Sequence, residues 1–161
     1  LAGDFVLHSP SIAPEAPMQQ LHYAKVYGCS GANTSPELNW AGAPEGTQSF
    51  AISFVDVDYG SQGFVHWLAY NIPAQVQQLA QGATQGQLPA GVVQAKNDLG
   101  APEWIGSCPP LGQLHRYRYT LYALKTERVP LTVGTSAAAV RAYLAQNALG
   151  TATLIGTAGP R

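Results

Sequence analysis

Side chains that can carry charge or transfer protons stand at the ends of the most apolar segments of the chain. Asp56 and Asp58 end the first of these segments. His66 opens the second, and His115 opens the third, directly after a run rich in Gly and Pro. If the three segments are neighbouring strands of one sheet, these side chains meet at one edge. Carboxylates and imidazoles in one pocket can bind an anion, hold a metal ion, or act as a general acid and base.

The three alternatives are not equally supported by the residue types and their spacing. In the anion-binding interpretation, imidazolium and backbone N–H groups hold a phosphate or carboxylate while an aspartate orients one imidazole. A metal site is the weakest alternative, because the sequence contains no HxH or HxxxH pair. A serine nucleophile is not indicated, since there is no GxSxG and Ser107 lies in no such turn. A structural interpretation also stands for each position: aspartates at strand ends form turns, and a histidine beside Trp67 can be a satisfied core residue.

Three strands are predicted to position these residues. Residues 49–57 are apolar at nearly every position and rich in β-formers, which is typical of a central strand buried on both faces. Residues 66–72 form a second such run, and the Gly-rich turn at 60–63 favours an antiparallel pair. Residues 116–126 have the strongest strand pattern in the chain, with Arg116 and Arg118 expected on the face opposite the neighbouring tyrosines.

The remaining segments predict one helix and several shorter pieces. Ser136 is a suitable N-cap for a helix over 137–149, with apolar residues at three- and four-residue steps, and Gly150 is a suitable end. A strand is expected at 151–157 and a short one at 37–40, whereas 75–91 is polar, Gly-rich and without periodicity, as a long surface excursion would be. We therefore expect a mostly antiparallel β fold with one late helix.

Composition narrows the class of protein. The chain of 161 residues has 46% apolar and only 11% charged residues, with a formal net charge of −1. One domain over 1–161 is expected at this length. The absence of any Lys/Arg run argues against nucleic acid as a partner. The apolar runs are too short to cross a bilayer, so no transmembrane segment is expected.

The two cysteines bear on the compartment. Cys29 and Cys108 lie far apart with no CxxC or Cys/His metal spacing, so a structural disulfide is their natural use, and two buried free thiols are the alternative. Closing such a loop stabilises a fold by about 4 kcal/mol. The chain begins with Leu, as a chain would after removal of a signal peptide or after trimming. The cysteine pair favours removal of a signal peptide, and hence a periplasmic or secreted protein.

Two blocks of these residues resemble the signatures of the phosphatidylethanolamine-binding (Raf-kinase-inhibitor-like) family. Residues 54–60, Phe-Val-Asp-Val-Asp-Tyr-Gly, followed by His66-Trp67 and Asn71, resemble the block in which a strand ends in Asp-Pro-Asp-x-Pro and His opens the next strand. Residues 106–117 resemble the block G-x-x-PP-x-G-x-x-HRY. Residues 28–36 and 40–50 resemble the bacterial branch of the family, and the cysteine pair resembles its exported members.

The resemblance, which runs from about residue 4 to residue 157, implies a fold and a pocket. The fold would be a central antiparallel sheet packed with a smaller sheet and flanked by short helices. The pocket would bind phosphate, acetate or a phospholipid headgroup without catalysis, cofactor or metal. Its walls would be Asp56, His66, Pro109, Pro110, His115 and Tyr117, with Asp58 and Cys108 at the rim. Family members are also described as inhibitors of kinases and proteases, and a protein partner or a homodimer is compatible with the sequence.

The sequence departs from the family pattern in one place. Where the family has Asp-Pro-Asp-x-Pro, this chain reads Asp-Val-Asp-Tyr-Gly at 56–60. Both prolines are missing, so two fixed φ angles are lost and two backbone N–H groups are gained. We expect a rim that is looser, or reshaped by Tyr59.

Anion binding is therefore the leading hypothesis. His66 and His115 would supply charge and N–H donors to one anionic group, and Asp56 would accept from one imidazole. Binding should then weaken as pH rises past the histidine pKa values, ordinarily near 6.5. A protein that inhibits a kinase or protease is the alternative, and an Asp–His acid/base hydrolase is the third. An apolar rim would favour a lipid headgroup, and a flat polar rim would favour a protein partner.

Overall fold

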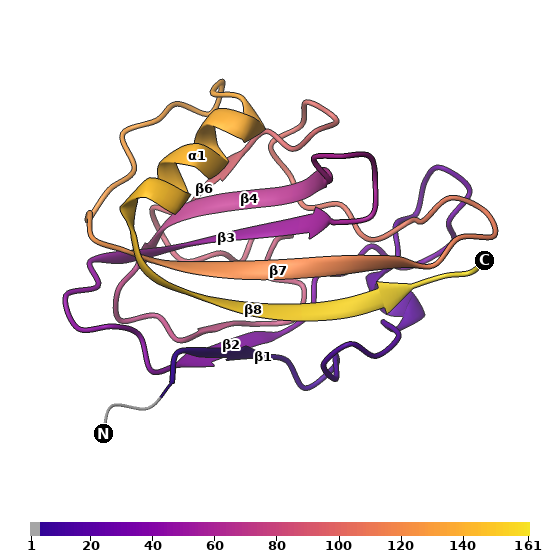
Figure 1. Ribbon diagram of the computed structural model, residues 1–161, viewed down its shortest axis with the longest axis horizontal. Helices are drawn as coiled ribbons and strands as arrows, with labels where there is room; N and C mark the ends of the chain where they lie inside the picture. The colour runs from indigo at the N-terminus through magenta and orange to yellow at the C-terminus, as the bar shows by residue number, and fades with distance from the viewer. Residues whose placement is uncertain (1–3) are drawn as a thin grey trace.

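The computed structural model describes residues 4–161 as a chain of short and long strands with one α-helix near the C-terminus (Figure 1). In chain order the elements are β1 (Val6–His8), a 3-10 turn η1 (Gln20–His22), β2 (Leu38–Ala41), β3 (Ser49–Asp56), β4 (Phe64–Pro73), β5 (Gln78–Leu79), β6 (Val93–Ala95), β7 (His115–Leu124), α1 (Ala137–Asn147) and β8 (Ala148–Ala158).

The strands form two sheets in which every pair of neighbours is antiparallel. The large sheet has the order β6-β4-β3-β7-β8 and the small one the order β1-β2-β5. All eight residues of β3 are buried, because β3 is the middle strand of the large sheet and both of its faces are covered. The predictions of a central strand here, and of an antiparallel partner after the 60–63 turn, are confirmed.

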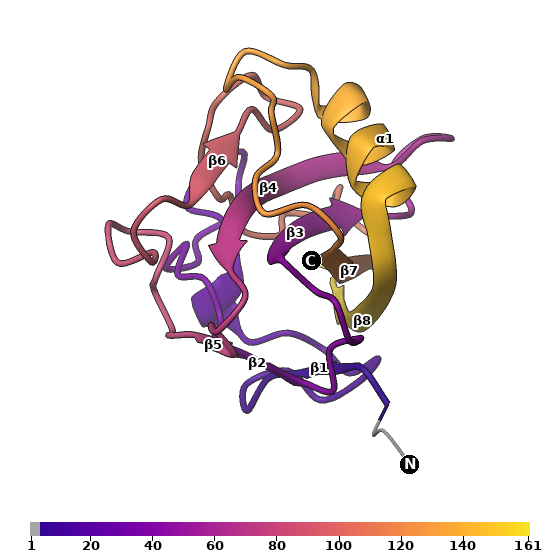
Figure 2. The ribbon, with the colours of Figure 1, turned by 90° about the vertical axis from the view of Figure 1, so that its left-hand side faces the viewer.

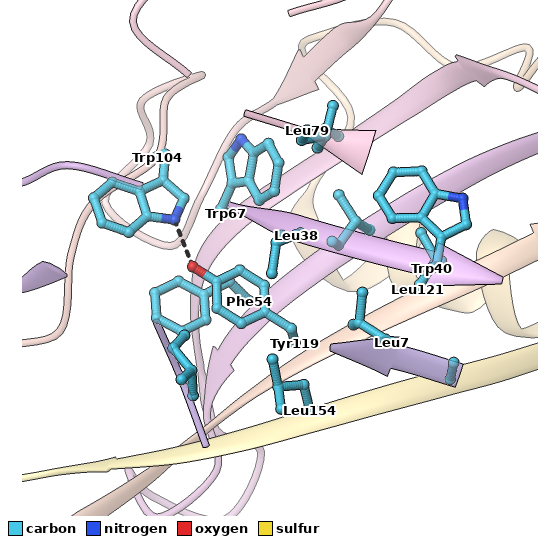
Figure 3. Close-up of a cluster of buried hydrophobic side chains, with 14 of the residues drawn as sticks. Leu7, Leu38, Trp40, Phe54, Trp67, Leu79, Trp104, Tyr119, Leu121 and Leu154 are labelled. Carbon is cyan, nitrogen blue, oxygen red and sulfur yellow. Dashed lines mark hydrogen bonds between the residues drawn. The ribbon is translucent and has the colours of Figure 1, made fainter. Parts of the chain in front are cut away.

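Each face of the large sheet is covered by a different layer. The small sheet lies against one face and α1 against the other, as the two views in Figures 1 and 2 show. Alternate residues of the strands point into the two layers. On the side of the small sheet, Phe54 stacks on Tyr119 with ring centroids 4.2 Å apart, and the indole N–H of Trp104 donates to the Tyr119 hydroxyl at 3.1 Å (Figure 3).

Helix α1 begins where the sequence predicts and ends earlier. The Ser136 hydroxyl accepts a hydrogen bond from the N–H of Ala139 at 3.2 Å, so the predicted N-cap is present. The predictions of a helix to residue 149 and of Gly150 as its end are wrong. Ala148 is already extended and pairs with Leu124, and Gly150 lies within β8 opposite Ala123. The pairing of β8 with β7 therefore ends the helix, where the local pattern would have continued it.

The small sheet is built from segments with weak patterns. The strand predicted at 37–40 is β2. The segment 75–91, predicted to be a long surface excursion without periodicity, contains the two-residue strand β5, which pairs with β2 through Leu79 and Leu38. A mostly β fold with two antiparallel sheets and one helix near the C-terminus is thus confirmed. None of the helices in residues 4–161 is long and apolar enough to cross a membrane.

Candidate functional site

The predicted strand ends do meet at one end of the large sheet, on the right in Figure 1. Asp56, the last residue of β3, lies opposite Phe64 of β4 and opposite Tyr117 of β7. His115 is the first residue of β7. The antiparallel order of the sheet therefore brings together residues that are about 60 positions apart in the chain.

A β-bulge places His66 on the same face as Asp56. Phe54 pairs with Trp67 and Val55 pairs with Val65, so His66 is an extra residue between two register positions. Val65 faces the helix layer and Trp67 faces the small sheet, although residues two apart in a regular strand share a face. The bulge thus turns the imidazole toward Phe54, with ring centroids 5.5 Å apart.

The hydrogen bonds of His66 show which of its ring nitrogens carries a proton. Its Nδ1 lies 3.1 Å from the carbonyl oxygens of both Ile105 and Gly106. Carbonyl oxygens only accept, so Nδ1 carries a proton and donates to them. Burial lowers the pKa of His66, against the opposing influence of these carbonyls and of Asp56. In the neutral ring Nε2 is therefore an unprotonated acceptor.

Asp56 and His115 form a buried pair. The carboxylate Oδ2 of Asp56 accepts from Nδ1 of His115 at 2.6 Å, and its Oδ1 accepts from the N–H of Asp58 at 3.0 Å. The other ring nitrogen of His115, Nε2, lies 2.8 Å from the amide oxygen Oε1 of Gln113. Both ring nitrogens of His115 are therefore engaged within the protein, and the residue orients Asp56.

Tyr117 adds a buried polar group beside Asp56. Its hydroxyl lies near the Asp56 carboxylate and the backbone of Cys108, without a well-formed hydrogen bond to either. Burial raises the pKa of Tyr117, and the nearby Asp56 carboxylate raises it further. Tyr117 is fully buried and is not part of the cavity lining described below, so it supports the site through its contact with His66, at a ring-centroid distance of 5.3 Å.

A cavity of about 300 Å³ opens between these residues and the surface. Its lining consists of Tyr27, Asp56, Tyr59, Phe64, His66, Leu99, Ile105, Gly106, Cys108 and Pro110. Of the residues expected in the walls, Asp56, His66 and Pro110 line the cavity, while His115 and Tyr117 contact it through Asp56 and His66.

Two of the expected residues are placed elsewhere. The carbonyl of Pro109 accepts from Nε of Arg161 at 2.7 Å, and Pro109 is not part of the lining. Asp58 makes an ion pair with Arg116 on the surface, with an Nη2–Oδ1 distance of 2.8 Å.

The rim of the cavity is apolar and consists of residues that sequence reasoning missed, apart from Tyr59. Tyr27 is 67% exposed, Tyr59 51% and Leu99 45%. They come from three separate loops, so no periodic pattern connects them. The one available signal was the occurrence of large apolar side chains within Gly-rich turns.

The residues that replace the family prolines have their own contacts. The N–H of Val57 donates to the carbonyl of Arg116 at 3.0 Å, a bond that proline cannot make. The ring of Tyr59 packs edge-on against Phe64, with centroids 5.3 Å apart. Tyr59 thus contributes a side chain to the rim of the cavity.

A disulfide ties the cavity wall to its rim. Cys29 and Cys108 are bonded, as predicted, so the alternative of two free thiols is wrong. Cys108 lines the cavity, and Tyr27 lies two residues before Cys29. The bond therefore joins two segments that contribute to the same site.

Comparison with known proteins identifies the family to which this fold belongs. A family profile described as phosphatidylethanolamine-binding protein matches residues 8–159. The chain belongs to the phosphatidylethanolamine-binding protein family. It is 40% identical to Escherichia coli YbcL over 156 residues, which cover 94% of this chain and 85% of YbcL. It is 38% identical to E. coli YbhB over 122 residues, covering 74% and 77% of the two chains.

Solved structures of phosphatidylethanolamine-binding proteins agree with the fold. The crystal structure of E. coli YbcL, described as a new member of the mammalian family, matches with a TM-score of 0.94 at 37% identity, covering 99% of this chain and 100% of YbcL. CT736 of Chlamydia trachomatis matches with a TM-score of 0.80 at 25% identity, covering 95% of each chain.

Proposed function

We propose that this phosphatidylethanolamine-binding protein family member binds the anionic headgroup of a small amphipathic ligand, a phosphoryl or carboxylate group, without chemical change. The observation that carries the proposal is the composition of the cavity. Its base holds His66 and Asp56, and its mouth holds exposed Tyr27, Tyr59 and Leu99. Such a cavity offers polar partners to a headgroup and apolar contact to the part of the ligand that follows it.

The protonation of His66 determines how an anion is held. Neutral His66 presents only a lone pair at Nε2, which cannot donate a hydrogen bond to an anion that has no proton of its own. Binding must therefore add a proton to Nε2, which then donates to the ligand. A phospholipid diester has no acidic proton at neutral pH, so it depends on this proton more than a monoester does.

The rim favours a headgroup ligand over the inhibition of a kinase or protease. The exposed apolar residues surround a concavity, whereas a docking site for a charged segment of a protein would be flatter and more polar. Enzymatic acid–base chemistry is less supported, because both ring nitrogens of His115 are already engaged. The disulfide is the support for a periplasmic or secreted location.

Calorimetric titration with glycerophosphoethanolamine tests the proposal. This diester keeps a constant charge between pH 5.5 and 8, so any change in affinity comes from groups on the protein. We expect affinity to fall with rising pH by up to about tenfold per pH unit above the pKa of free His66. Measurement in two buffers of different ionisation enthalpy should show uptake of one proton on binding.

A matched pair of variants assigns the effect to one residue. H66Q removes the titrating ring, so its affinity should be weak and independent of pH. H8Q changes an exposed histidine that is not part of the cavity lining and should bind as the unmodified protein does. Equal affinity of the unmodified protein at pH 5.5 and pH 8 would contradict the proposal.

A further inference from the structure

A second cavity lies on the other face of the large sheet, on the side of α1. It has a volume of about 210 Å³ and is lined by Val55, Val57, Ser61, Gln62, Gly63, Arg118 and Arg141. Arg118 pairs with Val55 across β7 and β3, one position from the Tyr117–Asp56 pair. Because successive residues of a strand face opposite ways, the two cavities are separated by the thickness of the sheet.

Two guanidinium groups without a carboxylate partner line this cavity. The ion pairs formed within residues 4–161 are Asp56–His115 and Asp58–Arg116, so neither Arg118 nor Arg141 takes part in one. Arg141 donates from Nη1 to the carbonyl of Gln62 at 3.3 Å, which orients its side chain across the turn between β3 and β4.

Arg118 has a donor with no acceptor. Its Nε is buried and makes no hydrogen bond in the described part of the chain, although the side chain as a whole is half-buried. An unpaired buried donor is costly, and one on a charged group is more so. Within residues 4–161 nothing accepts from this Nε–H, and Arg118 itself lines the cavity, so an anion or a water there can satisfy the group after a small movement of the side chain.

We propose that the cavity between Arg118 and Arg141 is a second anion site, which binds a tetrahedral oxyanion such as sulfate, phosphate or a phosphate monoester. Guanidinium groups present planar pairs of donors that match the oxygens of such anions. Two of them from different elements can contact more than one edge of a tetrahedron, and the Ser61 hydroxyl supplies a further donor from the turn. A planar carboxylate would use only one of the two arginines fully.

The second site has a different pH response from the first. Arg118 and Arg141 are the ionisable side chains among the residues that line it, and arginine stays charged at any ordinary pH. Sulfate also keeps its charge across this range. Binding of sulfate here is therefore independent of pH between 5.5 and 8.5, whereas binding at the His66 cavity is not. The two proposals can thus fail separately.

NMR of the arginine Nε–H groups during titration with sulfate tests the site. We expect the Arg118 Nε–H signal to shift and to saturate, with the same affinity at pH 5.5 and pH 8.5 and in H66Q. R141Q should weaken the binding by about tenfold or more, because one charged donor pair is lost. The matched control is R128Q, which removes an exposed arginine outside this cavity.

Two results would overturn the second site. One is an Arg118 signal that responds to sulfate no more than to sodium chloride of equal ionic strength. The other is equal sulfate affinity in R141Q and R128Q. The first result is read from the unmodified protein, so it does not depend on whether any variant folds.

Discussion

At the residue scale, His66 and His115 have different surroundings, although both open a strand and the sequence gives no reason to distinguish them. His66 lines the cavity and has one free ring nitrogen, whereas His115 has both nitrogens engaged and acts on Asp56. The difference arises from their neighbours. Backbone carbonyls hold one nitrogen of His66, and side chains hold both nitrogens of His115. Within the described residues, His66 is therefore the histidine of the site with a ring nitrogen left to contact a ligand.

Asp58 gives a prediction at the same scale. The side chain of Arg116, with help from its backbone N–H, lowers the pKa of Asp58 to about 2. A depressed carboxyl pKa contributes stability that is present above the unfolded value near 3.9 and lost as pH falls toward 2. In R116Q the pKa of Asp58, measured by carbon NMR, should rise, yet stay below its ordinary value because the amide of residue 116 still donates at 2.7 Å.

The same experiment separates the ion pair from the cavity. Asp58 is not part of the cavity lining, so R116Q should bind glycerophosphoethanolamine as the unmodified protein does. An unchanged Asp58 pKa in R116Q would show that the ion pair does not form in solution.

At the element scale, the loop that carries the carbonyl partners of His66 packs closely against another segment of the chain, residues 22–24. A Cβ at Gly106 would lie 2.5 Å from the carbonyl oxygen of His22 and 2.7 Å from the amide nitrogen of Ala24. Both are backbone atoms that cannot turn away, so the loop must move.

Substitution of this glycine should therefore affect stability and site together. We expect G106A to lower the free energy of unfolding by about 1–3 kcal/mol, as overpacking does, and to weaken ligand binding at the His66 cavity. Unfolding in urea and calorimetric titration measure the two effects. G134A is the control, since a Cβ there meets nothing closer than 3.8 Å. Equal stability of G106A and G134A would contradict the close approach.

The elements that the sequence predicted well are those whose burial is reflected in their own residues. Strand β3 is apolar at nearly every position because both of its faces are covered, so its place in the middle of the sheet could be inferred. The Ser136 cap is likewise a local interaction. The end of α1 could not be inferred, because it is set by the pairing of Ala148 with Leu124, which is distant in the chain.

The site was predictable in its location and not in its detail. The strand ends that carry Asp56, His66 and His115 could be recognised from residue types. The bulge at His66 could not, because a regular strand starting from Trp67 would point His66 toward the helix layer. The apolar rim could not be predicted for a related reason. Tyr27, Tyr59 and Leu99 lie in separate loops and meet only when the fold is complete.

At the scale of the whole molecule, the disulfide closes a loop that contains β3 and β4, the antiparallel pair in the large sheet. Cys29 and Cys108 are 79 residues apart, and β2 to β6 lie between them. Restricting the unfolded chain over such a length stabilises the folded state by about 4 kcal/mol.

Removal of this bond should be visible in stability and in the rim. We expect C29A/C108A to lower the free energy of unfolding by about 4 kcal/mol, measured in urea. Exchange of the amide proton of residue 29, which donates to the carbonyl of Val26 at 3.1 Å, should be faster, because its segment loses its bond to the cavity wall. Dithiothreitol should reproduce the loss in the unmodified protein and have no effect on the variant. Equal stability with and without the bond would refute this expectation.

Because backbone carbonyls orient His66, the site can accept amino-acid substitutions during evolution at some positions and not at others. Every residue has a carbonyl oxygen, so substitutions at position 105 leave the group that His66 contacts in place, and only Gly106 is restricted, by its lack of room. The rim, in contrast, is made of side chains alone. Substitutions at residues 27, 59 and 99 can therefore change the mouth of the cavity while the orientation of His66 at its floor is kept.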